Sequence, residues 1–170
     1  AAKLLNKKFI IYETNSVMGR VNKFFLKSTT RLFTGYPLKD SNIDNEKIIF
    51  VGQLIREQIY IAKNSKQIKK NDDFNFTLLV VGGSQGAKIF SSILPRTLNK
   101  LFNLNLKIKI FHQVGNKDHE GMLDHSYKNN TNVKIFNFEP HIENYMIQSD
   151  LVITRAGSST LSELAFLQIP

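Results

Sequence analysis

The stretch Leu79-Val80-Val81-Gly82-Gly83-Ser84-Gln85-Gly86-Ala87 decides the fold. Its apolar, β-branched start predicts a buried strand, and the glycines that follow predict a tight turn into a helix. The first amides of such a helix lack partners within the helix, and with the helix dipole they favour an anion such as phosphate. Glycine has no Cβ, so a ligand can approach this backbone closely. The predicted phosphate loop consists of Gly82, Gly83, Gln85 and Gly86, with Ser84 projecting from it; Ser84 and Gln85 could instead only tie the loop together.

A similar turn lies near the end of the chain, in Thr154-Arg155-Ala156-Gly157-Ser158-Ser159-Thr160-Leu161-Ser162-Glu163. Strand and helix patterns alternate from residue 76 onward, which predicts an α/β fold with a parallel, doubly wound sheet. Ligands of such sheets bind outside the carboxyl ends of the strands. Both glycine turns follow predicted strands, so we expect them to face one pocket.

Glu163 has two interpretations. Thr160 and Glu163 fit a capping box, in which the glutamate bonds back to the amide of the capping residue. Alternatively, Leu161, Leu164 and Ala165 form the buried stripe of the helix and leave Glu163 beside it. A carboxylate there can accept hydrogen bonds from two neighbouring hydroxyl groups, such as those of a ribose. The hydroxyls and amides of the preceding turn would then meet phosphate or sugar.

Other polar residues give weaker signals. Arg56 follows a predicted strand and could reach into a cleft between domains, although an unpaired surface arginine is the plainer alternative. His112 ends a strand, where a lone histidine usually packs in the core or at the rim. The remaining histidines show no ligand spacing and no paired acidic motif is present, so no metal site is expected.

The composition narrows the class of protein. The chain has 170 residues, a formal net charge of +9 and no cysteine, so no disulfide or thiolate metal site can form. The basic residues are scattered and no aromatic–basic RNA signature accompanies them, so nucleic acid is not an expected partner. Three basic residues would share a helix face with an apolar stripe, which suits an anionic membrane surface or an ordinary amphipathic helix. They are Arg20, Lys23 and Lys27, beside Val17, Val21, Phe24 and Phe25.

The pattern of elements also predicts a domain boundary. Strands are expected at 8–13, 31–34, 48–51, 76–81, 106–112, 133–138 and 151–154, with helices from Asn15 or Ser16 to about Ser28 and at 86–102, 117–127, 142–148 and 158–167. Residues 52–73 change in composition, and 63–70 are typical of a solvated linker. Because the segment before them is too short for a complete α/β domain, we expect it to be the end of a truncated one.

These motifs resemble those of one family, the bacterial cell-wall glycosyltransferases that form lipid II (glycosyltransferase family 28). The resemblance runs along the whole chain in the expected order. It is carried by Glu13-Thr14-Asn15 with Gly19, Val51-Gly52 before Arg56, the glycine stretch at 82–87, His112-Gln113-Val114-Gly115, and Arg155-Ala156-Gly157 through Ser162-Glu163-Leu164-Ala165.

The resemblance implies a GT-B fold of two Rossmann-like, doubly wound domains. Residues 1–53 would be the last part of a truncated N-terminal acceptor domain, and 54–170 an incomplete UDP-sugar-binding domain. The implied reaction is inverting, metal-independent and cofactor-free: N-acetylglucosamine moves from UDP-GlcNAc to the C4 hydroxyl of the muramyl sugar of lipid I. The implied location is peripheral, on the cytoplasmic face of the inner membrane, with an anionic membrane surface as a partner.

The resemblance also implies which residues hold UDP-GlcNAc: Asn15, Arg56, Ser84, the backbone of Glu139, and Ser158, Ser159, Thr160, Leu161, Ser162 and Glu163. Glu163 would hold the ribose and Ser84 the diphosphate. The candidate base would lie before Ala1 and further donor-sugar contacts after Pro170. We therefore expect this segment alone to be inactive.

The chain departs from the family pattern in four places. Tyr12-Glu13-Thr14-Asn15 stands where His-Glu-Gln-Asn is usual, Met18 replaces a proline, Gln53-Leu54 replaces Asn-Pro, and Glu139 replaces an apolar residue. The last is compatible with donor binding if only the backbone contacts uracil.

Two alternatives remain open from the sequence. One is a non-catalytic UDP-sugar-binding subunit or decayed homologue that needs a partner. The other is a NAD(P)-binding Rossmann protein, whose G-x-G-x-x-G spacing differs from the G-G-x-x-G of this chain.

Overall fold

The computed structural model describes residues 2–39, 45–65, 74–83, 88–104, 106–115, 123 and 125–170. Within it the chain separates into two compact units, Ala1–Ile55 and Arg56–Pro170. Ser84, Gln85 and Gly86 of the predicted phosphate loop lie outside the described residues, as does most of the helix expected at 117–127.

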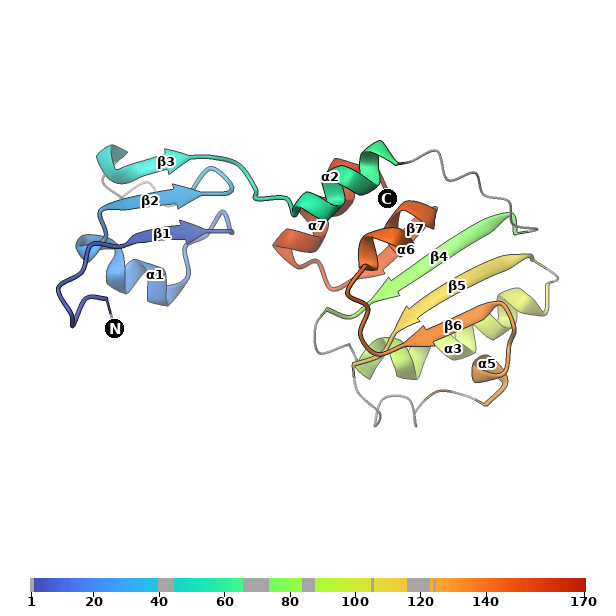
Figure 1. The fold of residues 1–170 in the computed structure, drawn as a ribbon. Helices are drawn as coiled ribbons and strands as arrows, with labels where there is room; N and C mark the ends of the chain where they lie inside the picture. The colour runs from blue at the N-terminus through green and yellow to red at the C-terminus, as the bar shows by residue number, and fades with distance from the viewer. Residues whose placement is uncertain are drawn as a thin grey trace. The chain divides into compact units, whose positions relative to one another are not determined.

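The first unit contains a parallel sheet with the strand order β1-β2-β3 (Figure 1). Its strands are β1 (Ile10–Glu13), β2 (Arg31–Thr34) and β3 (Ile48–Phe50), and its helical segments are α1 (Arg20–Phe25), η1 (Leu26–Ser28) and η2 (Asn45–Lys47). The segment after β3 is tied back to β1 by the hydroxyl of Tyr12, which donates to the Gly52 carbonyl at 3.0 Å and accepts from the Leu54 amide at 3.1 Å.

The expected cap of the first helix was wrong. The helix begins at Arg20 with Gly19 as its N-cap, rather than after Asn15 or Ser16. The reason is the buried Glu13 carboxylate, which accepts hydrogen bonds from the backbone and side-chain amides of Asn15, the amide of Gly19 and the side chain of Asn22. Burial raises the pKa of Glu13, but these donors outweigh it and the net pKa is lowered.

The second unit is built on a four-stranded parallel sheet with the order β6-β5-β4-β7. Its elements in chain order are α2 (Glu57–Asn64), β4 (Phe76–Val81), α3 (Lys88–Phe102), β5 (Ile108–Gln113), α5 (His125–Lys128), β6 (Val133–Phe136), α6 (Ile142–Gln148), β7 (Leu151–Thr154) and α7 (Ser158–Leu167). Parallel neighbours need crossover connections, and helices supply them here.

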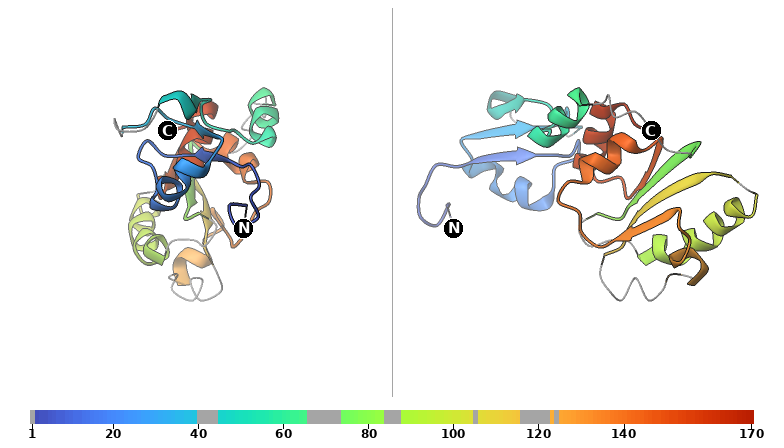
Figure 2. Two further views of the ribbon diagram at one scale, coloured as in Figure 1. Left: turned by 90° about the vertical axis from the view of Figure 1, so that its left-hand side faces the viewer. Right: turned by 45° about the vertical axis from the view of Figure 1, so that its right-hand side comes forward.

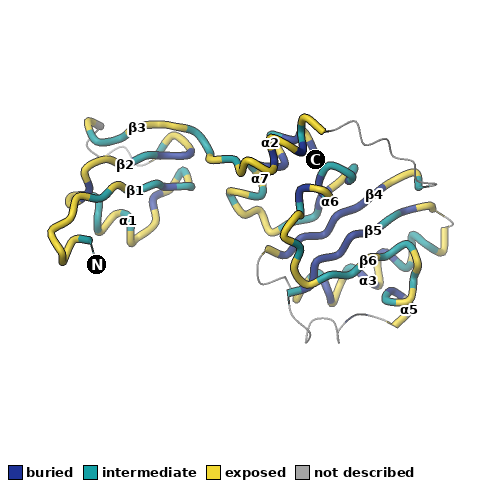
Figure 3. Tube along the Cα trace, in the orientation of Figure 1, coloured by how far each residue is buried: buried dark blue, intermediate teal, exposed yellow. Residues whose placement is uncertain are grey.

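Alternating side chains of the central strands build two cores, one on each face of this sheet. Leu78, Val80 and Ile110 pack with Leu98 of α3 and Tyr127 of α5. On the other face Phe111 makes an edge contact with Tyr145 of α6. Figure 2 shows α3 and α5 together on one side, with α2, α6 and α7 gathered on the other. Figure 3 shows that burial is concentrated in β4 and β5, the two strands with neighbours on both edges.

One helix was not expected. The segment 57–64, assigned from its composition to the domain boundary, forms α2, with Ile59 and Ala62 buried against its neighbours. The spacing of these two residues is the helical i, i+3 signal, but in so short a stretch it is hidden among lysines and amides.

The strand order creates a switch point beside β4. The chain moves from β4 to β5 and β6 on one side, then returns to place β7 on the other side of β4. Val81, the last residue of β4, is paired with Thr154, the last of β7. The two glycine turns therefore leave adjacent strands at the same edge of the sheet, where doubly wound folds bind their ligands.

Candidate functional site

The turns at this edge have unusual backbone conformations. Gly83 has a φ of 83°, which a residue with a Cβ rarely adopts. In the second turn Ala156 has a φ of 45°, although it is not a glycine. Non-glycine residues in this region are uncommon and cluster at functional sites.

Helix α7 starts directly after the second turn. Gly157 is its N-cap, and among the described residues no side chain caps it. The amides of Ser158, Ser159 and Thr160 occupy the first turn, where helix geometry leaves N–H groups without helical partners. The Ser162 hydroxyl donates to the Ser158 carbonyl at 2.8 Å, so this side chain bonds within the helix.

The capping-box interpretation of Glu163 is wrong. Because the helix starts at Ser158, Thr160 is already inside its first turn and Glu163 lies in the second. The expected buried stripe also differs. Leu164 is buried as expected, but Leu161 is 43% exposed and Ala165 is exposed, whereas Glu163 is only 6% exposed.

Arg56 is the partner of this buried carboxylate. Its Nε donates to Oε1 of Glu163 at 2.6 Å and an Nη to Oε2 at 2.9 Å. These hydrogen bonds, and the charges of Glu163 and Glu143, raise the pKa of Arg56 against the opposing effect of burial. Arg56 is therefore not an unpaired surface residue, and the structure joins two predicted site residues that are 107 positions apart.

Glu143 is a further acidic residue that the sequence analysis missed. It lies in the first turn of α6 and is 4% exposed. Its Oε2 is 3.9 Å from Nη1 of Arg56, and its Oε1 is 3.2 Å from Nδ1 of His141. From the sequence, a glutamate in the first turn of a helix is explained by its favourable interaction with the helix dipole. No local pattern indicates that Glu143 is buried beside Arg56.

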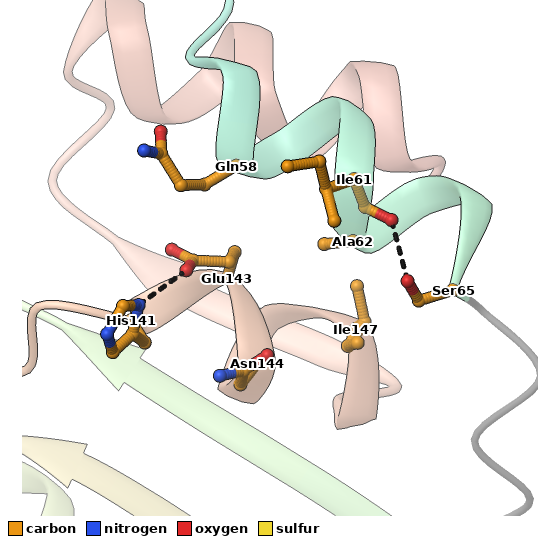
Figure 4. Close-up of a pocket in the computed structure, with 8 residues that line it drawn as sticks. All are labelled: Gln58, Ile61, Ala62, Ser65, His141, Glu143, Asn144 and Ile147. Carbon is orange, nitrogen blue, oxygen red and sulfur yellow. Dashed lines mark hydrogen bonds and ion pairs between the residues drawn. The ribbon is translucent and has the colours of Figure 1, made fainter.

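A cavity of about 260 Å³ lies beside this glutamate, between α2 and α6. Figure 4 shows its lining, which is polar near Gln58, His141 and Glu143 and apolar near Ile61 and Ile147. Two of these polar residues lie near Arg56: Gln58 belongs to the first turn of α2, which Arg56 precedes, and Glu143 has an oxygen 3.9 Å from Nη1 of Arg56.

The other predicted residues lie in separate places. Asn15 belongs to the first unit, where its side chain is bonded to Glu13 and Thr14. Glu139 is partly buried, and its Oε1 accepts a hydrogen bond from the His141 amide at 3.0 Å. No group of three or more possible metal ligands occurs in the described part of the chain.

His112 is fully buried, as the packed alternative predicts. Its Nδ1 shares a hydrogen bond of 3.0 Å with the Tyr127 hydroxyl, and its Nε2 has no partner among the described residues. Burial lowers the pKa of His112 to about 4 and raises that of Tyr127.

The basic, apolar helix of the first unit is only partly as expected. The helix is shorter than expected, because α1 spans only Arg20–Phe25. The apolar side chains predicted to face a membrane are exposed, as Val17, which precedes the helix, and Val21 and Phe24 within it are 56%, 68% and 70% exposed. Phe25 instead packs against Phe9 and Phe24 in edge contacts. Of the described helices, none has the length and apolar character needed to cross a bilayer.

A parallel sheet with a glycine turn and a helix N-terminus at its switch point defines a Rossmann-like α/β domain. Residues 77–170 match the model of the glycosyltransferase family 28 C-terminal domain. The chain belongs to this family.

Two curated relatives carry the name UDP-N-acetylglucosamine–N-acetylmuramyl-(pentapeptide) pyrophosphoryl-undecaprenol N-acetylglucosamine transferase. The protein of Pelagibacter ubique is 37% identical over 99% of this chain and 47% of its own length. That of Rickettsia felis is 35% identical over 100% of this chain and 49% of its own length. The chain spans about half the length of these relatives, and their names do not favour a NAD(P)-binding protein.

Solved structures share the fold. The crystal structure of Acinetobacter baumannii MurG matches with a TM-score of 0.62 and 24% identity, covering 96% of this chain and 44% of that one. The UDP-GlcNAc 2-epimerase of Methanocaldococcus jannaschii matches with a TM-score of 0.58 and 18% identity, covering 99% and 55%. The predicted fold class, a GT-B fold with Rossmann-like parallel sheets, is confirmed.

Proposed function

We propose that the complete protein transfers N-acetylglucosamine from UDP-GlcNAc to the C4 hydroxyl of the muramyl sugar of lipid I, which forms lipid II for peptidoglycan synthesis. Family membership and the names of the relatives support this proposal. We further propose that residues 54–170 bind the donor and that residues 1–53 belong to the acceptor-side domain.

The pairing of Arg56 with the buried Glu163 carries the donor-site proposal. A carboxylate with two oxygens can accept both vicinal hydroxyls of a ribose, and a guanidinium forms paired hydrogen bonds with phosphate oxygens. Both groups belong to the second unit, where they are hydrogen-bonded to each other. Glu163 lies in α7, the helix that begins after the turn at the carboxyl end of β7. This chemistry matches a nucleoside diphosphate.

The reaction that we propose is metal-independent. The leaving diphosphate would be stabilised by the first amides of α7, the glycine turn after β4 and Arg56, all of which present positive charge or dipoles. Positioning of the donor against the acceptor hydroxyl would supply most of the remaining rate acceleration. The base that removes the acceptor proton is proposed to come from a part of the protein before Ala1.

We propose a peripheral location on the cytoplasmic face of the inner membrane. Exposed Val17, Val21 and Phe24 support this, because apolar side chains enter the acyl boundary of a bilayer. The nearby Arg20 and Lys23 would contact anionic lipid, each basic residue contributing about 1 kcal/mol near such a surface.

A titration of the complete protein distinguishes a UDP-sugar site from a dinucleotide site. Isothermal calorimetry with UDP-GlcNAc is expected to give saturable binding, while NADH at the same concentrations gives none, because the G-G-x-x-G turn and Glu163 suit a nucleotide diphosphate sugar. Tight binding of NADH without a response to UDP-GlcNAc would overturn the proposal.

A further inference from the structure

Two buried carboxylates share one guanidinium in the second unit. Glu163 is 6% and Glu143 is 4% exposed, whereas the Arg56 side chain between them is 44% exposed. Arg56 gives Glu163 two hydrogen bonds, at 2.6 and 2.9 Å, but stands 3.9 Å from Glu143. The longer distance exceeds that of a hydrogen bond, so Glu143 receives only a charge interaction.

The Glu143 carboxylate is held in place but incompletely satisfied. Its Oε1 faces His141 at 3.2 Å, and its Oε2 has no hydrogen-bond partner among the described residues. Figure 4 shows the Glu143 side chain at the start of α6, with its carboxylate directed at His141. Helix α2, which Arg56 precedes, is the neighbouring helix across the cavity. An unsatisfied buried oxygen on an ionised group costs free energy, and native structures usually retain one for a reason.

Binding of a ribose at Glu163 would change how the Arg56 guanidinium is shared between Glu163 and Glu143. The two oxygens that would accept the hydroxyls of a ribose are the two oxygens that Arg56 now occupies. A diol brings no positive charge, so it can replace the hydrogen bonds but not the cation. The hydroxyl groups then compete with the guanidinium for the same two oxygens, and each of its five N–H groups that loses Glu163 needs another acceptor.

We infer that Glu143 is a positioning residue for Arg56: it takes over the guanidinium when the ligand's hydroxyl groups occupy Glu163. Glu143 then accepts hydrogen bonds from some N–H groups of Arg56, while the other N–H groups of Arg56 face the anionic part of the ligand. This inference rests on the proposed donor site. It adds a residue to that site whose role is to keep Arg56 aligned with the diphosphate rather than to touch the donor.

The test is a double-mutant cycle on UDP binding to the complete protein, measured by calorimetry. Glu143→Gln removes the charge and keeps the size of the side chain. It is expected to weaken UDP binding about tenfold, which is at the lower end of the range for one hydrogen bond to a charged group. In an Arg56→Met background the same substitution is expected to change binding by less than about twofold, because no guanidinium remains to position. Glu57→Gln removes an exposed charge from the first turn of α2, next to Arg56 in the sequence. It is the matched control, with an expected change below about twofold.

The outcomes separate the inference from the function on which it rests. If the parent protein does not bind UDP, both fail. If the parent binds UDP and Glu143→Gln weakens binding equally in both backgrounds, Glu143 has only a structural role and the inference is overturned. A tenfold loss that disappears in the Arg56→Met background, with the Glu57→Gln protein like the parent, supports it.

Discussion

Glu163→Gln is expected to weaken UDP binding by about 1.5–3 kcal/mol, which corresponds to about a 10- to 150-fold rise in Kd. The carboxylate is buried and both of its oxygens accept hydrogen bonds. Glutamine keeps the shape but replaces one acceptor oxygen with a donor, so it cannot accept both hydroxyl groups of a ribose. Calorimetry of the complete protein with UDP measures the change.

The ligand supplies the control for this substitution. The parent protein is expected to bind 2′-deoxy-UDP at least about tenfold more weakly than UDP, because the missing hydroxyl leaves a buried acceptor unpaired. The Glu163→Gln protein is expected to lose most of that preference. An equal loss of affinity for both nucleotides would mean that Glu163 serves only to anchor Arg56.

Folding stability is expected to fall at acidic pH because of the buried His112. The pKa of His112 is about 4 in the folded protein, below its ordinary 6.5, because burial penalises the charged imidazolium. The unfolded chain therefore binds more protons than the folded one between these values, and stability is lost as the pH falls from 6.5 toward 4. The expected loss is about 1.4 kcal/mol per pH unit, or about 3 kcal/mol in all.

Two measurements check this expectation. The ring proton signals of His112, followed by NMR, are expected not to titrate until the pH approaches 4. Denaturation of the His112→Gln protein is expected to show a smaller loss of stability over the same range. Titration of His112 near pH 6.5 would contradict the account of its burial.

The parallel sheet of the second unit was predictable because its signals are local. The strands 76–81 and 151–154 and the helices 142–148 and 158–167 were placed with the observed bounds. Apolar runs that stop at glycine turns carry this information within a few residues. The pairing of β4 with β7 then follows from the doubly wound topology, which places both turns at one edge.

The arrangement of the acidic residues was not predictable in the same way. The bond between Arg56 and Glu163 joins residues 107 positions apart, and only tertiary packing creates it. The Thr-x-x-Glu spacing of Thr160 and Glu163 fits a capping box, but the N-cap of α7 is Gly157, so this local pattern gave a wrong interpretation of Glu163. Glu143 gave no signal at all, since its importance comes from burial beside a half-exposed arginine.

The most direct test of the proposed function is a transfer assay with the complete protein, labelled UDP-GlcNAc and a lipid I analogue in vesicles. The label is expected to move to the lipid, and to move faster in anionic than in zwitterionic vesicles, because the basic and apolar residues near α1 would bind the charged surface. Equal rates in both vesicles would remove the membrane-surface proposal alone. A protein that binds UDP-GlcNAc but transfers no label to lipid I in either vesicle would contradict the central claim.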